Sequence, residues 1–208
     1  MNRHAVQLIS RGAITKIGNM LYDYGNSVWL ASMGTIGKTV LGIYQISELV
    51  TGILVNPFGG VISDRFSRRK ILMTTDLVCG LLCLAISFIR NDRWMIAALI
   101  VANIVQAIAF GFSRPANKAI ITEVVEKEEI VTYNAHLELV LQVVSVSSPV
   151  FSFLVLQFAS LHATLLLDAL TFFIAFVLVA FLPKEEAKAQ EKKPFTGKDI
   201  FSDMKEGL

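Results

Sequence analysis

The chain has 208 residues, of which 54% are apolar and only 17% are charged. This composition is typical of a membrane protein and excludes an ordinary soluble domain. The net charge of +2 is small, and no nucleic-acid partner is expected. The apolar residues form continuous blocks, which favours membrane-spanning helices over short alternating strands.

Six blocks are long enough to cross a hydrocarbon core of about 30 Å as helices. Because the links on one side of these blocks are short, consecutive helices must run antiparallel. We therefore predict an all-α membrane protein, with a six-helix transmembrane bundle in residues 1–183. The predicted spans are residues 14–35, 40–61, 71–89, 94–113, 131–156 and 161–182.

Lysine and arginine are distributed unequally between the two sides of the predicted bundle. With six spans, both ends of the chain lie on one side, and the opposite links carry only Lys38, Arg90 and Arg93. The positive-inside rule then places both ends in the cytoplasm of a multi-pass protein of the cell (plasma) membrane. A basic loop over residues 59–70 is the densest cationic segment, with Arg65, Arg68, Arg69 and Lys70.

The composition changes abruptly after Pro183. Residues 184–208 are rich in lysine and glutamate, and we predict that they begin a central cytoplasmic linker. An amphipathic pattern that includes Ile200, Phe201 and Met204 is cut off at Leu208. This pattern suggests a fragment of a longer chain.

Polar side chains recur at helical spacing inside the predicted spans and share one face of each helix. Such side chains either join helices by hydrogen bonds or line a water-filled path. A stripe in the last span contains Thr164, Asp168 and Thr171. We assign the following residues to a substrate and proton pathway: Asn19, Asp23, Asn26, Glu48, Asn103, Gln106, Glu138 and Gln142.

Two of these carboxylates are predicted near the membrane midplane. At a rise of 1.5 Å per residue, Asp23 and Glu48 reach similar depths on adjacent antiparallel helices. Asp76 and Glu138 lie nearer the cytoplasm, and no lysine or arginine is expected deep within a span. A buried acid without a cation binds either a proton or a cationic substrate. This combination is typical of proton-coupled export of cationic or amphiphilic compounds.

The two cysteines, Cys79 and Cys83, lie one helical turn apart in the third predicted span. We interpret them as small packing residues, because free cysteine behaves as a small apolar side chain. Their surroundings contain no ligand pattern that indicates a disulfide or a metal site.

The basic loop resembles the signature of the major facilitator superfamily, G-x-x-x-D-R-x-G-R-R/K, with Ser67 in place of the second glycine. Residues 64–70, the Arg114-Pro115-Ala116 turn and residues 168–173 are similar to the macrolide-efflux-like, drug-exporter branch. The resemblance covers the chain as the N-terminal half of a twelve-helix transporter. The residues that match the signature are Gly60, Asp64, Arg65, Arg68 and Arg69.

This resemblance implies two inverted three-helix repeats that rock against a missing C-terminal six-helix half. It also implies that the matching residues form a conformational gate on the cytoplasmic side. Asp64 would pair with Arg68 and meet the N-terminus of a helix in the missing half. Glu123, at the end of the fourth helix, is the expected acidic partner. The alternative is that the arginines only set topology and bind lipid headgroups.

Two motifs of the family's drug antiporters are altered in this chain. Residues 103–107 read Asn-Ile-Val-Gln-Ala, where antiporters often carry R-x-x-Q-G. Residues 148–152 read Ser-Pro-Val-Phe-Ser, where they often carry G-P-x-x-G. The first change removes an arginine, whereas the second keeps small residues that allow close helix packing.

The sequence thus predicts a secondary active transporter for multidrug or macrolide-type efflux, driven by the proton gradient and without a cofactor or metal. The expected partners are a small-molecule substrate, the lipid bilayer and the missing half. Two alternatives are a facilitator or importer of a small metabolite, and a truncated, non-transporting membrane module. An enzyme is not expected, because the sequence contains no nucleophile–base set, metal cluster or phosphate loop.

Overall fold

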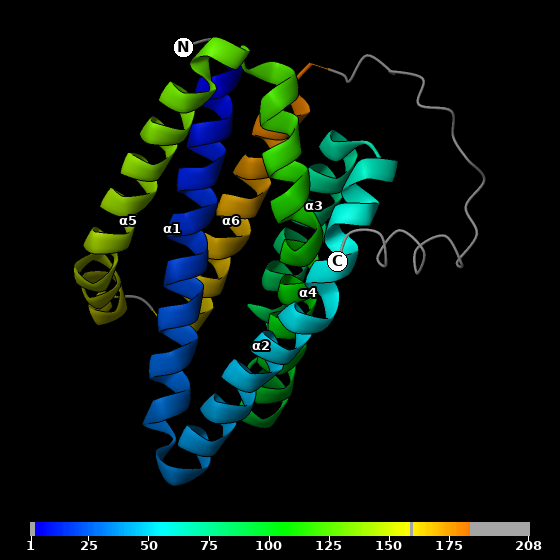
Figure 1. Cartoon of the computed structure of the whole chain (residues 1–208). Coiled ribbons are helices and arrows are strands. Elements are labelled where there is room, and N and C mark those ends of the chain that lie inside the picture. Colours follow the sequence, from blue (N-terminus) through cyan, green and yellow to red (C-terminus); the bar gives the residue numbers. More distant parts are fainter. Residues whose placement is uncertain (1–2, 159, 184–208) are drawn as a thin grey trace, which may run out of the picture.

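The chain folds into a bundle of α-helices (Figure 1). The structure is a computed structural model that describes residues 3–158 and 160–183, and these ranges contain no β-strand. The predicted linker over residues 184–208 lies outside the described residues. The elements are α1 (Arg3–Ser32), α2 (Gly34–Arg65), α3 (Arg68–Ile86), α4 (Asp92–Val124), the short 3-10 helix η1 (Lys127–Glu129), α5 (Ile130–Phe158) and α6 (Leu161–Ala180).

Each predicted span overlaps one α-helix, which confirms the all-α prediction for the described residues. Three helices, α2, α4 and α6, combine the length and the apolar composition that a membrane span requires. Helix α3 is too highly charged to meet the same criterion, because it contains Arg68, Arg69, Lys70 and Asp76. The prediction of six spans is therefore supported only in part.

Helices α1, α2 and α4 extend further than predicted at the end of the bundle where α1 begins, and α4 continues to Val124 rather than to residue 113. Helix α1 starts at Arg3, well before residue 14, and α2 continues through residues 59–65. The basic loop expected over residues 59–70 is therefore wrong, because only Phe66 and Ser67 link α2 to α3. Ser67 is the N-cap of α3, and its hydroxyl accepts a hydrogen bond from the Lys70 backbone N–H at 3.4 Å.

The expected turn at Arg114-Pro115-Ala116 is also wrong, because α4 passes through Pro115 without a break. Pro57 and Pro149 likewise lie inside α2 and α5. A proline inside a membrane helix is tolerated because neighbouring helices and polar side chains can satisfy the carbonyl that loses its hydrogen bond.

Helices α1 and α2 meet at a tight turn and diverge from it, while α1 begins and α6 ends at the opposite end of the bundle (Figure 1). Gly34 follows the turn residue Met33 and has φ +74°, which glycine adopts without steric strain. Helix α1 packs against α5 and α6, α3 packs against α4 and α6, and α2 packs mainly against α4.

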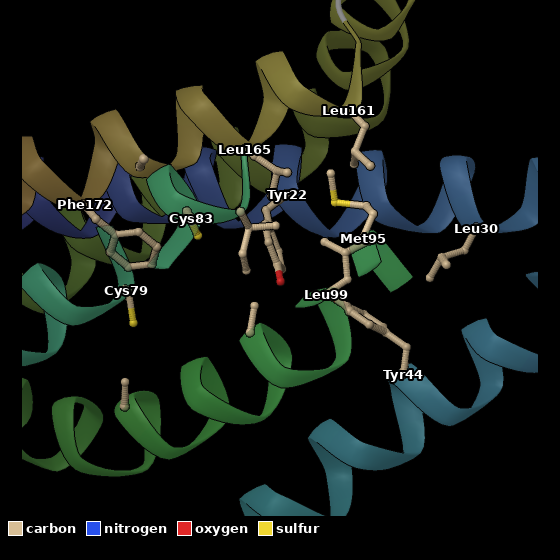
Figure 2. Close-up of a cluster of buried hydrophobic side chains, with 14 residues drawn as sticks. Tyr22, Leu30, Tyr44, Cys79, Cys83, Met95, Leu99, Leu161, Leu165 and Phe172 are labelled. Carbon is tan, nitrogen blue, oxygen red and sulfur yellow. The ribbon is translucent and has the colours of Figure 1, made fainter. Parts of the chain in front are cut away.

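The buried apolar residues form two clusters along the bundle. The cluster in Figure 2 brings Tyr22, Cys83, Leu99 and Phe172 together from four helices. A second cluster, which includes Leu8, lies where α1 begins and α6 ends. Large apolar side chains on the outer surfaces of α2 and α5 stay exposed, and they include Ile46, Leu49, Ile53, Val143, Val146 and Val150.

Helices α2 and α4 approach most closely at a pair of glycines. A Cβ atom placed on Gly59 would lie 2.0 Å from the backbone oxygen of Gly111. Backbones can pack at this separation only where one helix has no side chain, as in other membrane helix pairs with small residues at the contact.

Replacing Gly59 by alanine should therefore destabilise the protein by about 1–3 kcal/mol, because the added methyl group meets backbone that cannot move aside. Gly42→Ala is a matched control in the same helix, since a Cβ atom there meets nothing within 4 Å. This control should be neutral or stabilising by up to about 1 kcal/mol, because alanine favours the helix. Thermal unfolding in detergent measures both, and equal stabilities of the two variants would contradict the close contact.

Candidate functional site

A buried ion pair joins three helices near the start of α1. Arg11 in α1 donates from Nη2 to Asp76 Oδ1 in α3 at 2.7 Å, and from Nε to Asp76 Oδ2 at 3.1 Å. Its Nη1 donates to Asn117 Oδ1 in α4 at 3.2 Å. The two charged side chains are only 9% and 4% exposed. Separating such a pair would leave a buried charge without a partner, which is costly. Arg11 therefore fixes the positions of α1, α3 and α4 relative to one another.

For Asp76, this ion pair overturns the expectation that the carboxylates inside the spans lack a cation. The predicted first span begins at residue 14 and therefore leaves Arg11 outside it. Helix α1 starts at Arg3, so Arg11 instead lies well inside the helix and faces Asp76.

The arginines of the signature bind other helices of the same bundle. Arg68 forms an ion pair with Glu123, near the end of α4. Arg69 donates to the backbone oxygens of Val179 and Ala180, at 3.2 and 2.5 Å. The last carbonyls of a helix lack partners within it and attract cations, so Arg69 stabilises the end of α6. These contacts tie α3 to α4 and α6.

Asp64 and Gly60 are left outside this internal packing. Asp64 lies in the last turn of α2, is exposed, and forms no ion pair with any residue that the structure describes. The expected pair with Arg68 is therefore wrong, because Arg68 turns toward Glu123. A Cβ atom on Gly60 would meet nothing within 4 Å. Arg65 is exposed beside Asp64, and the gate assigned to these residues stays a prediction.

Hydrogen bonds connect three helices near the middle of the bundle. The Asn26 side-chain amide donates to the Tyr44 hydroxyl at 3.3 Å, and the Asn103 amide donates to the Tyr44 backbone oxygen at 2.7 Å. Asn26 and Asn103 are both buried. Their position inside helix contacts shows that they join α1 and α4 to α2, whereas their predicted part in a pathway is untested.

Asp168 in α6 is fully buried, although it was not among the residues assigned to the pathway. The Cys83 thiol donates to Asp168 Oδ2 at 3.3 Å, and Gln106 Nε2 donates to the Cys83 sulfur at 3.1 Å. Cys83 is thus a polar link between α4 and α6 as well as a packing residue. The signal in the sequence was an acid in the polar stripe of the last span, but its partner Cys83 could not be read there, since contacts between helices leave no local pattern.

Several buried polar atoms around this link have no hydrogen-bond partner among the described residues. A polar atom left without a partner costs about 1–3 kcal/mol. Figure 2 shows the Tyr22 side chain pointing from α1 into the cluster. The atoms on α1 and α6 are Asn19 Oδ1, the Tyr22 hydroxyl, Asn26 Oδ1 and Asp168 Oδ1.

The two predicted midplane carboxylates line open hollows on the bundle. Asp23 lines a hollow of about 320 Å³ between α1 and α5, together with Tyr24. Glu48 lines a hollow of about 370 Å³ between α2 and α4, together with Phe110 and Arg114. Both hollows place a carboxylate next to aromatic and apolar side chains. In the hollow of Glu48, however, Arg114 already lies over the Phe110 ring, at 5.8 Å from its centroid. The hollow of Asp23 therefore suits a ligand with a cationic group and an apolar body better than that of Glu48 does.

Glu138 and Gln142 do not join these groups. Both are exposed on α5, which packs mainly against α1. Ser145 and Pro149, further along α5, do line the hollow of Asp23. The structure therefore brings only part of the predicted stripe of α5 to a hollow.

Comparison with known proteins assigns the family. A sequence model described as Major Facilitator Superfamily matches residues 12–205, which is most of the chain. The chain belongs to the major facilitator superfamily. Members of this superfamily that resemble the chain are named as membrane transporters and not as enzymes.

Two relatives come from Bacillus subtilis (strain 168). The arabinose-proton symporter is 28% identical over 113 residues, which cover 51% of this chain and 24% of the symporter. The uncharacterized MFS-type transporter YfiS is 21% identical over 211 residues, which cover 97% of this chain and 47% of YfiS. The chain therefore spans at most about half the length of these relatives.

The ion pair between Arg11 and Asp76 can be tested by a double-mutant cycle. Arg11→Gln alone should destabilise the protein by about 3–5 kcal/mol, because it leaves a buried carboxylate without its cation. The double variant R11Q/D76N should recover part of this loss, since two neutral amides can share a hydrogen bond. Thermal unfolding in detergent measures the cycle, and simple addition of the two single effects would contradict the pair.

Proposed function

We propose that the protein is a proton-coupled secondary transporter that exports cationic or amphiphilic, drug-like compounds of the macrolide type. The observation that carries this proposal is the placement of Asp23 and Glu48. Each carboxylate opens onto a hollow that also presents aromatic or apolar side chains, and the hollow of Glu48 contains Arg114 as well. A compound with a positive charge and an apolar body matches both properties.

The same carboxylates supply a mechanism for coupling. A carboxylate bordered by apolar surface is stabilised either by a proton or by the cation of a bound substrate. When the substrate's cation binds, the proton is no longer needed and is released, and the reverse holds when a proton binds. This competition at one site exchanges a proton for a substrate, which is antiport.

The exposed apolar faces support a second six-helix half in the whole protein. The outer surfaces of α2 and α5 present Ile46, Leu49, Val143 and Val146, which are all exposed here. We expect this half and the lipid bilayer to cover them, with both ends of the chain on the cytoplasmic side of the cell membrane.

The gate fits the same arrangement. Arg68 and Arg69 hold α3, α4 and α6 together, so this half can move as one body. Asp64 is left exposed at the end of α2, where a carboxylate can meet the positive N-terminus of a helix in the other half. We expect this contact to close the cytoplasmic side and to break when that side opens.

A second candidate function is proton-driven import of a small polar solute. The similarity to a relative named arabinose-proton symporter favours it. In that case the proton and the solute would move in the same direction. Transport of a labelled pentose and of a cationic dye, measured against the same pH gradient, separates the two candidates.

Substituting Asp23→Asn or Glu48→Gln tests the proposed coupling in proteoliposomes that contain the whole protein. With one proton exchanged per substrate, a gradient of one pH unit supports about a tenfold substrate ratio. We expect this ratio to fall toward one in both variants, because neither amide can release a proton. Ser27→Ala and Gln45→Ala line the same hollows without a charge and should keep the ratio. Unchanged coupling in both acid variants would exclude these two carboxylates as the coupling groups.

If Asp64 belongs to the gate, Asp64→Asn should slow transport but leave the stability of the protein unchanged. Asp64 has no ion pair within the described residues, so the free energy of unfolding should change by no more than about 0.5 kcal/mol. The turnover should fall about tenfold, since the closed state loses its contact between the halves. Lys70→Gln is the control. Lys70 is exposed in the first turn of α3, and this variant should transport normally. Normal turnover in D64N would rule out the gate contact.

A further inference from the structure

Asp168 is held differently from the carboxylates that open onto the hollows. It is fully buried in α6, whereas Asp23 and Glu48 are exposed. Asp76 is also buried, but Arg11 balances its charge. Among the described residues, no lysine or arginine contacts Asp168. Its charge, unlike that of Asp76, is therefore not compensated by a side chain.

The hydrogen bonds of Asp168 do not compensate for this missing charge. Its Oδ2 accepts from the Cys83 thiol at 3.3 Å, and a thiol is a weak donor. The Gln106 amide donates to the Cys83 sulfur, and Gln106 and Thr171 also lie near the carboxylate and favour its charged form. None of these neutral groups replaces a cation, so a carboxylate ion inside the bundle is costly and a bound proton removes that cost.

The second oxygen of Asp168 faces α1. A Cβ atom on Gly18 would lie 2.0 Å from Thr171 Oγ1 and 2.7 Å from Asp168 Oδ1, so both side chains rest against the α1 backbone. Asp168 Oδ1 has no hydrogen-bond partner among the described residues. Tyr22 lies one turn further along the same face of α1, and its buried hydroxyl also has no partner there. The lack of a side chain on Gly18 thus lets α6 pack closely against α1 at Asp168, whose Oδ1 is left without a partner.

Two helices besides α6 bring titratable groups near Asp168. On α1 these are Tyr22 and the Asp23 carboxyl group, whose charge acts on Asp168. On α3 the thiols of Cys79 and Cys83 are buried and free. Helix α4 contributes the neutral amide of Gln106. Within α6 itself, Thr164 and Thr171 donate to backbone oxygens of their own helix. Of the two acids, Asp168 is the fully buried one, so a negative charge there is the more costly.

We propose that Asp168 binds and releases a proton during the transport cycle, at a site separate from the substrate hollows. This inference rests on the proposed proton coupling. A hydronium ion transfers its proton to Asp168 Oδ1 and leaves a water molecule, and the packed conformation then encloses the neutral acid. When α1 and α6 separate, the proton passes to water on the other side, and the hydrated carboxylate remains. No electrons are transferred and no other reactant is consumed.

The site is connected to the hollows through α1. Tyr22 precedes Asp23 in sequence, and Asn26 binds the Tyr44 hydroxyl of α2. Substrate binding that moves α1 therefore also changes the packing of Gly18 and Tyr22 around Asp168. The charge state of Asp168 and the position of α1 are linked in this way, without contact between Asp168 and the substrate.

Asp168→Asn in the whole protein is the first test. Asparagine has the same shape but cannot bind and release a proton. In proteoliposomes, we expect the substrate ratio that a gradient of one pH unit holds to be about tenfold smaller in D168N than in the unmodified protein, because one exchanged proton is lost. Exchange of labelled for unlabelled substrate without a gradient, and its KM, should be unchanged. Thr164→Val, at a buried position one turn away, is the control and should keep the ratio.

Cys83→Ala provides a second test that does not depend on the folding of D168N. Removing the thiol takes away the donor that favours the carboxylate ion, so the pH midpoint of transport should move to higher pH. A purely structural role for Asp168 would leave this midpoint in place. An unchanged pH profile in C83A, or full coupling in a folded D168N, would overturn the proposal.

Infrared spectroscopy separates this inference from the proposed function. The carbonyl band of a protonated carboxyl group should decrease with rising pH in the unmodified protein, and this component should be missing in D168N. Absence of gradient-driven transport in the unmodified protein would refute proton coupling alone. Absence of an Asp168 component across the neutral pH range would refute the protonation site.

Discussion

The hydrocarbon interior of a membrane offers no hydrogen-bond partners, and this constraint organises the whole bundle. Each polar side chain inside a helix must find a partner on another helix or open onto water. Arg11 meets this requirement by binding Asp76 and Asn117 at once, and Asn103 meets it at the backbone of Tyr44. Polar contacts thus set which helices meet and at which level.

The arginines of the signature also find their partners on other helices of the bundle. Arg68 and Arg69 bind Glu123 and the end of α6, so they stabilise contacts within this bundle. Asp64 and Gly60 take no part in that packing and remain available to another surface. A half that rocks as one body needs both properties, internal contacts that persist and exposed groups that change partners.

Much of the architecture follows from local pattern. The long apolar blocks predicted the helices, and the spacing of polar residues predicted that Asn26 and Asn103 lie on inward faces. The helix ends were harder to predict. The length of a span is set by hydrocarbon thickness, whereas the length of a helix is set by its backbone hydrogen bonds. Helix α1 therefore begins at Arg3 although its apolar part begins later. For the same reason the pair between Arg11 and Asp76 was not predicted, because Arg11 precedes the predicted span.

The sequence by itself determined the class of the protein, its helical content and its family, because these depend on composition and on short local motifs. Only the tertiary structure decided which polar groups are paired. Asp76 has a cation and Asp168 does not, yet both are acids inside apolar segments. The difference depends on contacts between helices far apart in the chain, such as Cys83 with Asp168. Packing geometry sets these contacts, and no local pattern encodes it.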